Sequence, residues 1–187
     1  RLPFAGHRLG ETPAGSGSHG LPVISSADDG GSSWAPARLI HDQENEIYVM
    51  NQRLLELSTG RVLLAVSFRD PEVPHDRYGE GSSPCAGGLY ASDDRGQTWH
   101  PGSGVVRQGG ARGAQEPCIF EGADGRLCML FRGGRGAHQA CWSADGGQSW
   151  TEPSSTSLEA ACSPLTVTTL RDGRAMVAYN PARPLCP

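Results

Sequence analysis

The segment Ser143-Ala144-Asp145-Gly146-Gly147-Gln148-Ser149-Trp150 carries an eight-residue pattern that occurs three times in the chain. Residues 92–99 and 27–34 are the other two copies, and all three share Asp at the third position, Gly at the fifth, Ser or Thr at the seventh and Trp at the eighth. An Asp side chain can hydrogen-bond the backbone of a tight turn, and a Gly two residues later allows a left-handed backbone. The hydroxyl and the indole then tie the turn to a sheet, with the indole burying most area. We therefore predict a recurring structural turn.

The first copy departs from the other two in one place, because Ala27 stands where they have Ser. The turns lack the number of oxygen ligands that calcium requires, and the Cys and His residues lack zinc-site spacing, so we predict no metal. The residues to which we assign the structural role are Asp29, Gly31, Trp34, Ser92, Asp94, Gly96, Trp99, Ser143, Asp145, Gly147 and Trp150.

A second signal follows each turn after about two dozen residues: a Gly-Arg pair and then an apolar run. The pairs are Gly60-Arg61, Gly125-Arg126 and Gly173-Arg174, and a shorter apolar stretch precedes each of them. Short apolar runs bounded by Gly, Asp, Ser and Pro are typical of hairpin strands. No long stretch shows helical periodicity, so the sequence predicts an all-β fold.

The repeat length indicates a β-propeller. Trp34 and Trp99 are 65 residues apart and Trp99 and Trp150 are 51 apart, which leaves room for about four short strands per repeat. We predict one partial propeller domain over residues 1–187 that supplies about three blades. A propeller closes with roughly four to eight blades, so we expect an arc whose unpaired end strands allow self-association.

Composition limits the partners. The net charge is −4 and the isoelectric point is near 5.8, so no basic face argues for nucleic acid. No stretch has the apolar length of a membrane span. The cysteines could form disulfides in an oxidising compartment or could equally be buried free thiols, so the compartment stays open, with a secreted or periplasmic location favoured. They are Cys85, Cys118, Cys128, Cys141, Cys162 and Cys186.

The three turns resemble the Asp-boxes of the sialidase (neuraminidase) superfamily, also called BNR repeats. Residues 115–132 resemble the sialidase segment that carries a catalytic Glu, a strand, a turn, a strand and an Arg. The resemblance covers nearly everything from Ser25 to Pro181 and is closest to bacterial BNR-repeat exo-α-sialidases. It implies a six-bladed propeller that removes terminal sialic acid from glycans without a cofactor.

The resemblance also implies site residues. Glu116 matches the Glu that takes a proton from the nucleophilic Tyr of the family, and Arg132 matches one of three arginines that bind the sugar carboxylate. A guanidinium suits that role because it binds a carboxylate bidentately. Two antiparallel strands joined by a tight turn return the chain to its starting level, so we expect Glu116 and Arg132 at the same end of one blade. The alternative is a simple ion pair that bridges the two strands, worth about 0.2–1 kcal/mol if it is exposed.

Further candidates complete the expected site. Arg53, Arg69 and Arg183 are candidates for the remaining carboxylate-binding arginines, with surface charge as the alternative for Arg53 and Arg69. Asp70 and Asp76 are candidates for the general acid and base. The family Tyr lies beyond the position of Asn180, and Tyr179 is expected inside a strand, so we expect this chain alone to be catalytically incomplete.

Two functions remain after this reading. One is a glycoside hydrolase of the exo-α-sialidase type that acts on a sialoglycan or another acidic sugar. The other is a non-catalytic Asp-box propeller that binds a glycan or a protein partner.

Overall fold

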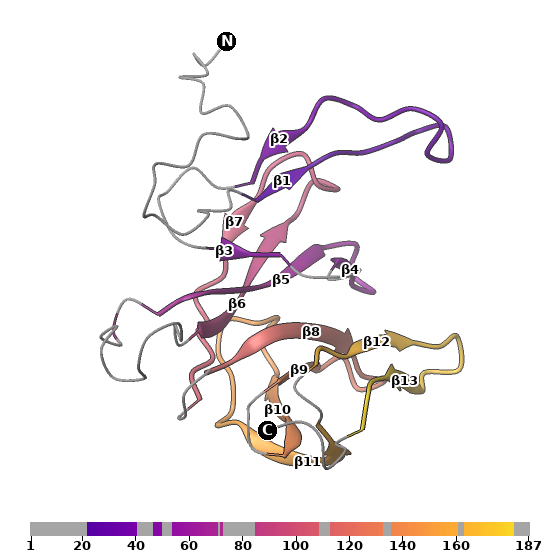
Figure 1. Ribbon diagram of the computed structural model, residues 1–187. Helices are drawn as coiled ribbons and strands as arrows, with labels where there is room; N and C mark the ends of the chain where they lie inside the picture. Colours follow the sequence, from indigo (N-terminus) through magenta and orange to yellow (C-terminus); the bar gives the residue numbers. More distant parts are fainter. Residues whose placement is uncertain are drawn as a thin grey trace.

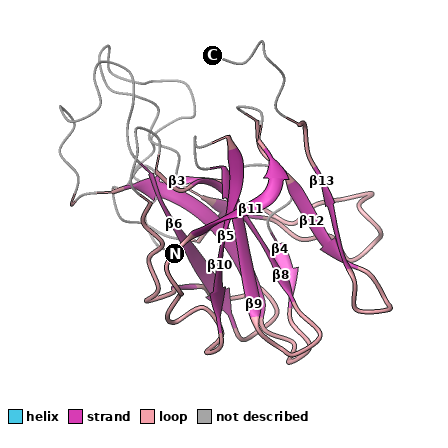
Figure 2. Cartoon of the chain, turned by 90° about the horizontal axis from the view of Figure 1, so that it is seen from below, coloured by secondary structure: helices cyan, strands magenta, loops and turns pink. Residues whose placement is uncertain are grey.

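The computed structural model describes residues 22–40, 47–49, 54–70, 72, 85–108, 113–132, 136–160 and 163–181. Within these ranges the chain consists of strands and loops, and Figure 2 shows no helix. All strand pairs between named strands are antiparallel. The all-β prediction is therefore confirmed.

Two sheets have the strands of complete propeller blades (Figure 1). Blade A has the order β3-β5-β6-β7, with β4 also paired to β5, and blade B has the order β8-β9-β10-β11. The strands of blade A are β3 (Ile47–Tyr48), β4 (Leu54–Glu56), β5 (Val62–Arg69), β6 (Cys85–Ser92) and β7 (His100–Pro101). Those of blade B are β8 (Gln115–Glu121), β9 (Leu127–Arg132), β10 (Ala137–Ser143) and β11 (Ser154–Glu159).

A two-stranded sheet lies on either side of these blades. β1 (Val23–Ile24) and β2 (Arg38–Leu39) flank the first Asp-box, as the last two strands of blades A and B flank theirs. β12 (Thr166–Thr169) and β13 (Ala175–Ala178) flank the Gly173-Arg174 turn, as the early strands of the blades do. Within the described residues, the repeats thus form two complete blades and two half blades, an open arrangement that fits the predicted partial propeller.

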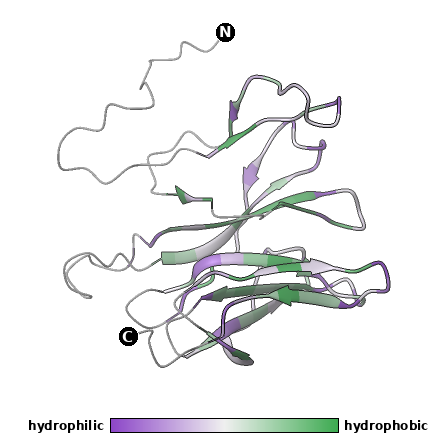
Figure 3. Ribbon diagram, turned by 45° about the vertical axis from the view of Figure 1, so that its right-hand side comes forward, coloured by the Kyte–Doolittle hydropathy of each residue, from purple (hydrophilic) through white to green (hydrophobic). Residues whose placement is uncertain are grey.

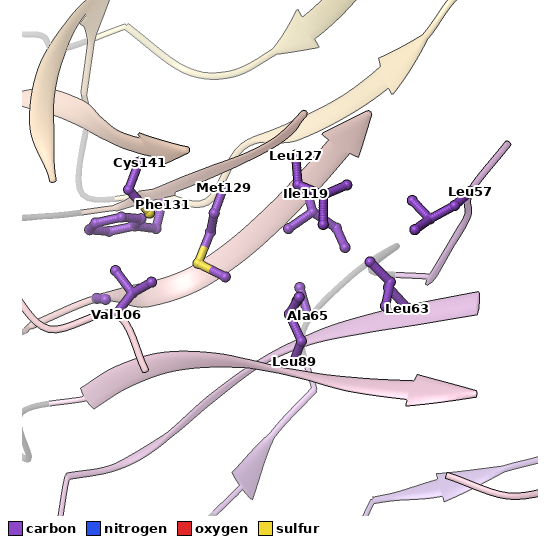
Figure 4. Packing of buried hydrophobic residues seen from close by; sticks show 11 residues of the cluster. Leu57, Leu63, Ala65, Leu89, Val106, Ile119, Leu127, Met129, Phe131 and Cys141 are labelled. Atoms are coloured by element: carbon purple, nitrogen blue, oxygen red, sulfur yellow. The ribbon is translucent and has the colours of Figure 1, made fainter. Parts of the chain in front are cut away.

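The largest core cluster lies between blades A and B. Figure 4 shows Leu63, Ala65 and Leu89 of blade A facing Ile119 and Met129 of blade B. Alternation along β5 explains this, because residues on one face of a strand recur every second position. The full cluster is Leu57, Leu63, Ala65, Leu89, Val106, Ala114, Ile119, Leu127, Met129, Phe131 and Cys141.

The other faces of the blades are covered as well. Leu64 and Val66 of β5 pack with Ile40 and Ile47 on the side toward β1 and β2. Cys118, Cys128 and Leu130 of blade B pack with Leu165, which precedes β12. Figure 3 shows hydrophobic stretches running along the strands of both blades. Each complete blade is therefore a layer with apolar contacts on both faces.

The four described cysteines are buried in these layers, and Cys162 and Cys186 lie outside the described residues. Burial raises the pKa of Cys128 and of Cys141 to about 12. Such thiols behave as small apolar side chains in the core.

The Asp-boxes of blades A and B share four hydrogen bonds that join the first Ser, the Asp, the second Gly position and the Ser or Thr before the Trp. In blade B, Asp145 Oδ1 accepts from the Ser149 backbone N–H at 2.9 Å, and Oδ2 accepts from the Ser149 hydroxyl at 2.5 Å. Ser143 donates its hydroxyl to Asp145 Oδ1 at 2.7 Å and accepts the Gly147 N–H at 2.8 Å. These bonds, led by that of the Ser149 hydroxyl, lower the pKa of Asp145 to about 2. The carboxylate is thus held by its own turn.

The first Asp-box is looser. Asp29 accepts from the Ser33 backbone and hydroxyl at 3.1 and 2.7 Å, as in the other boxes. Ala27 has no hydroxyl for the bracing bonds that Ser92 and Ser143 make. Trp34 is also 66% exposed, whereas Trp150 packs against the core between the blades.

A recurring contact joins each repeat to the next Asp-box. Arg38, four residues after Trp34, donates from Nη1 to the Gln97 carbonyl at 2.9 Å. Ser103, four residues after Trp99, donates its hydroxyl to the Gln148 carbonyl at 3.2 Å. The Asp-box end of the molecule therefore also aligns neighbouring sheets.

Candidate functional site

The Glu116 and Arg132 side chains lie at the end of blade B opposite its Asp-box. β9 begins at Leu127, which pairs with Ser143 at the entrance of the box, and ends at Arg132, which pairs with Gln115. We call the two ends of the blade the Asp-box end and the Glu116 end. The structure thus brings the two sequence-predicted residues together at one strand end.

A β-bulge changes the pairing there. From Glu121 back to Cys118, β8 pairs in regular register with β9, and a regular continuation would place Glu116 opposite Arg132. The register shifts between Gln115 and Cys118, so Gln115 occupies that position instead. Pro117 has no N–H for the ladder, which is why a bulge is favoured at this point.

The bulge places Glu116 in an unfavourable backbone conformation. Its φ is +51°, in the left-handed region, and the following residue is Pro117. Residues before proline are biased toward extended conformations, and left-handed non-Gly residues cost about 1–3 kcal/mol. Strain of this kind persists only where the surrounding structure enforces it, and it clusters at functional sites.

The two charged groups form a largely buried ion pair. Glu116 Oε2 lies 3.3 Å from Arg132 Nε, and each side chain is 13% exposed. The energy expected for an exposed ion pair therefore does not apply to them. Glu116 Oε2 accepts no hydrogen bond from the described residues. The carboxylate is close to a positive charge but not locked to it.

Two neighbours hold this pair from either side. Gln115 Oε1 accepts a hydrogen bond from Arg132 Nη2 at 2.6 Å. The Glu116 backbone N–H donates to the Ser67 hydroxyl at 3.3 Å, and Ser67 belongs to β5 of blade A and is buried. The site therefore depends on contact between the two blades.

Arg69, a predicted carboxylate-binding residue, ends β5 and pairs with Cys85 at the start of β6. Alternation along β5 places it on the same face as Ser67, which is the face that packs against blade B. Arg69 is half-buried at the Glu116 end of blade A. Its role remains a prediction.

Asp70, a predicted acid or base, is buried in an ion pair. Its side chain is 4% exposed, and Arg107 donates to it from Nε at 2.7 Å and from Nη2 at 3.3 Å. Arg107 Nη2 also lies 3.2 Å from the exposed Glu72 carboxylate. A carboxylate held this way is well suited to fixing the loop after β5, and its proposed chemistry remains a prediction.

Three of the predicted residues, Arg53, Arg183 and Asp76, lie outside the described residues. Tyr179, expected inside a strand, instead follows β13, and its ring packs edge-on against that of His138 at 5.5 Å. His138 is fully buried, and its burial lowers its pKa. This aromatic contact joins the half blade of β12 and β13 to blade B near Arg132.

Sequence reasoning missed Gln115, Ser67 and Arg107 as partners of the site. The Glu116-Pro117 step inside a strand was the available signal for the bulge, because Pro interrupts the ladder. Nothing in the sequence separates Ser67 or Arg107 from other polar residues, since their contacts cross from one segment of the chain to another.

No three His, Cys, Asp or Glu side chains in the described part of the chain gather into a group that could hold a metal ion. Among the same residues, no helix is long and apolar enough to cross a membrane.

Comparison with known proteins identifies the family. The model of the BNR repeat-like domain matches residues 8–185, nearly the whole chain. The chain belongs to the BNR repeat-like domain family. None of the curated proteins compared with this BNR repeat-like chain matches it significantly.

Solved structures show the fold of this BNR repeat-like chain in larger proteins. A Dyadobacter fermentans protein of unknown function has a TM-score of 0.67 at 22% identity, and the match covers 83% of this chain and 43% of that one. Hadza microbial sialidase Hz136 has a TM-score of 0.63 at 21% identity, and the match covers 83% of this chain and 30% of that one. A leech intramolecular trans-sialidase has a TM-score of 0.61 at 22% identity, and the match covers 84% of this chain and 24% of that one. The chain thus spans less than half of each, and the likeness shows a sialidase-like propeller fold.

Proposed function

We propose that the protein is a glycoside hydrolase of the exo-α-sialidase type, which cleaves terminal sialic acid or a related acidic sugar from glycans at the Glu116 end. The observation that carries this proposal is the Glu116–Arg132 pair: a carboxylate and a guanidinium 3.3 Å apart, each 13% exposed, on a left-handed bulge. A fold that needed only packing would gain nothing from a strained backbone and two desolvated charges, which both cost stability.

The arrangement suits an anionic sugar. A guanidinium offers a planar set of donors that matches a carboxylate bidentately, and it gains strength where water is scarce. Sialic acid carries such a carboxylate on the carbon whose glycosidic bond breaks. Arg132 would bind that carboxylate, and Arg69, at the Glu116 end of blade A, would add a second positive charge.

Glu116 would act as a base. The sialidase resemblance implies a Tyr nucleophile on another part of the propeller, and a carboxylate beside it would take the phenolic proton as the oxygen attacks. The Glu116 carboxylate can serve this purpose because Oε2 accepts no hydrogen bond within the described residues.

The second candidate is a non-catalytic Asp-box propeller that binds a glycan or a protein partner. One observation favours it: Glu116 and Arg132 lie close enough to neutralise each other in the absence of a ligand. In that case the arginines would serve recognition, and Glu116 would only orient Arg132.

A hydrolysis assay separates the two candidates. The full-length protein is incubated with the 4-methylumbelliferyl glycoside of sialic acid and, as a control, with that of galactose. We expect fluorescence only from the sialoside, because only that sugar has a carboxylate for Arg132. Binding of sialic acid without turnover would support the second candidate, and neither binding nor turnover would reject sialic acid as the ligand of this site.

A further inference from the structure

Gln115 makes the shortest polar contact at the Glu116 end. Its Oε1 accepts from Arg132 Nη2 at 2.6 Å, and its Nε2 lies 4.0 Å from the Cys85 sulfur of blade A. A guanidinium has only donors, so the amide oxygen must face Arg132 and the amide nitrogen must face away. The Gln115 side chain therefore spans from Arg132 to the neighbouring blade.

The bulge makes this contact possible. Because the register shifts by one residue, Gln115 rather than Glu116 lies directly opposite Arg132 on the paired strand. Directly opposite residues on one face of a sheet are the ones whose side chains interact most closely. The same irregularity thus places an amide beside the guanidinium and lets the Glu116 carboxylate approach Nε.

The neutrality of the amide matters for an anion site. Gln115 can hold the guanidinium in place without adding negative charge, so Glu116 remains the carboxylate that the described contacts place against Arg132. A Glu at position 115 would also accept the hydrogen bond, but it would add a second carboxylate that competes with an anionic ligand. Electrostatic repulsion of a ligand is strong where side chains are mostly buried.

We infer that Gln115 is a positioning residue for Arg132: it fixes the guanidinium through a neutral hydrogen bond so that an acidic sugar can bind there. The ligand half of this inference rests on the proposed function, while the orientation of Arg132 does not. Hydrogen bonds to charged groups contribute about 1.5–3 kcal/mol, so losing this one should weaken ligand binding by about tenfold or more.

The test uses three variants of the full-length protein. Gln115→Met keeps the length of the side chain and removes the acceptor, and Gln115→Glu keeps an acceptor and adds charge. Gln139→Met is the matched control, because Gln139 is a buried amide of the same blade that bonds Ala137 and Ser155 instead of Arg132. Each variant is assayed for sialoside hydrolysis and for thermal unfolding.

We expect Gln115→Met to raise KM about tenfold or more with little change in kcat, and Gln115→Glu to raise KM further. Gln139→Met should leave KM unchanged even if it lowers the melting temperature. Unchanged KM in both Gln115 variants of an active enzyme would overturn the inference, because a purely structural residue would alter the melting temperature alone.

A second measurement needs no ligand. In ¹⁵N NMR spectra of the arginine side chains, a guanidinium held by a hydrogen bond rotates slowly and gives separate Nη signals. We expect slow exchange between the Arg132 Nη signals in the native protein and faster exchange in Gln115→Met, which lacks one hydrogen bond. If the exchange rate is the same in that variant, Gln115 does not position Arg132, whatever the hydrolysis assay returns. Faster exchange together with absent sialoside activity would retain the positioning role and reject the proposed function.

Discussion

The two ends of blade B are built by different kinds of interaction. At the Asp-box end, the hydrogen bonds of Asp145 join residues two to four positions apart in the sequence. At the Glu116 end, the bonds of Gln115 and Glu116 join residues 17, 30 and 49 positions apart, and two of them cross between blades. One end can form with its own turn, whereas the other forms only once the blades have packed.

The backbone shows the same contrast. The positive φ angles within the third Asp-box belong to Gly146 and Gly147, which accept them at little cost. At the opposite end, Glu116 has a positive φ without being Gly. The difference teaches that the Asp-box end stabilises the sheets, while the Glu116 end holds a strained and desolvated pair that the packed sheets enforce. Variants at matched positions test this division.

The largest effect is expected from Glu116→Gln. If Glu116 is the base, kcat for sialoside hydrolysis should fall about 10²- to 10⁴-fold with little change in KM, since general-base catalysis contributes that much. Steady-state kinetics of the full-length protein measure both. Glu121→Gln is the control at the other end of β8, where the carboxylate holds Ser58 of blade A at 2.8 Å. It should lower the melting temperature and spare kcat. Equal losses of kcat in both variants would contradict a catalytic role that is confined to the Glu116 end.

Arg132→Ala should have the next largest effect. Removing a guanidinium that faces a desolvated carboxylate costs about 2–5 kcal/mol of binding free energy. Isothermal titration with sialic acid measures this loss, and circular dichroism establishes that the variant is folded. Arg126→Ala serves as the control near the other end of β9, where the side chain is exposed and lies over the Trp142 ring at 5.1 Å. A loss well below this range for Arg132→Ala would favour a structural ion pair.

The Trp residues of the first and third Asp-boxes should differ in stability. Trp150→Ala removes an indole packed against the core between the blades and should lower the free energy of unfolding by about 3 kcal/mol. Trp34→Ala removes an indole that is 66% exposed and should change it by no more than about 0.5 kcal/mol. Chemical denaturation curves compare the two variants. Similar losses would mean that the first box is as well packed as the third.

The smallest expected effect is the contribution of the Asp145 carboxylate to stability at low pH. Hydrogen bonds from the following turn, above all from the Ser149 hydroxyl, lower the pKa of Asp145 to about 2, against about 3.9 in an unfolded chain. A lowered pKa in the folded state stabilises the fold above pH 4 and loses that effect as the pH falls toward 2. Melting temperatures measured from pH 6 to pH 2 should fall less steeply for Asp145→Asn than for the native protein. Parallel curves would show that this carboxylate does not contribute.

The parts that sequence predicts well are those with local causes. The Asp-box at Asp145 and the hairpin around Gly125-Arg126 lie within short segments, so their turns, strands and relative ends could be deduced from residue types alone. The same reasoning placed Glu116 and Arg132 at one end of a blade, and the structure joins them at 3.3 Å.

What sequence did not predict depends on packing between segments. The bulge places Gln115 instead of Glu116 opposite Arg132. Ser67 contacts the site from another blade. The sequence shows Asp70 as an acid after Arg69 on a polar loop, but it does not show the partner Arg107, which is 37 residues away. Such pairs become visible only when the blades are placed against each other.

The most direct test of this division of labour is a map of amide NMR shifts on adding sialic acid. We predict that the largest shifts fall on residues at the Glu116 end, namely Gln115, Glu116 and Arg132 of blade B and Ser67 of blade A. The amide signals of Gly147 and Ser149 in the Asp-box should keep their chemical shifts. Shifts centred on the Asp-boxes, or no shifts at saturating sugar, would contradict the account.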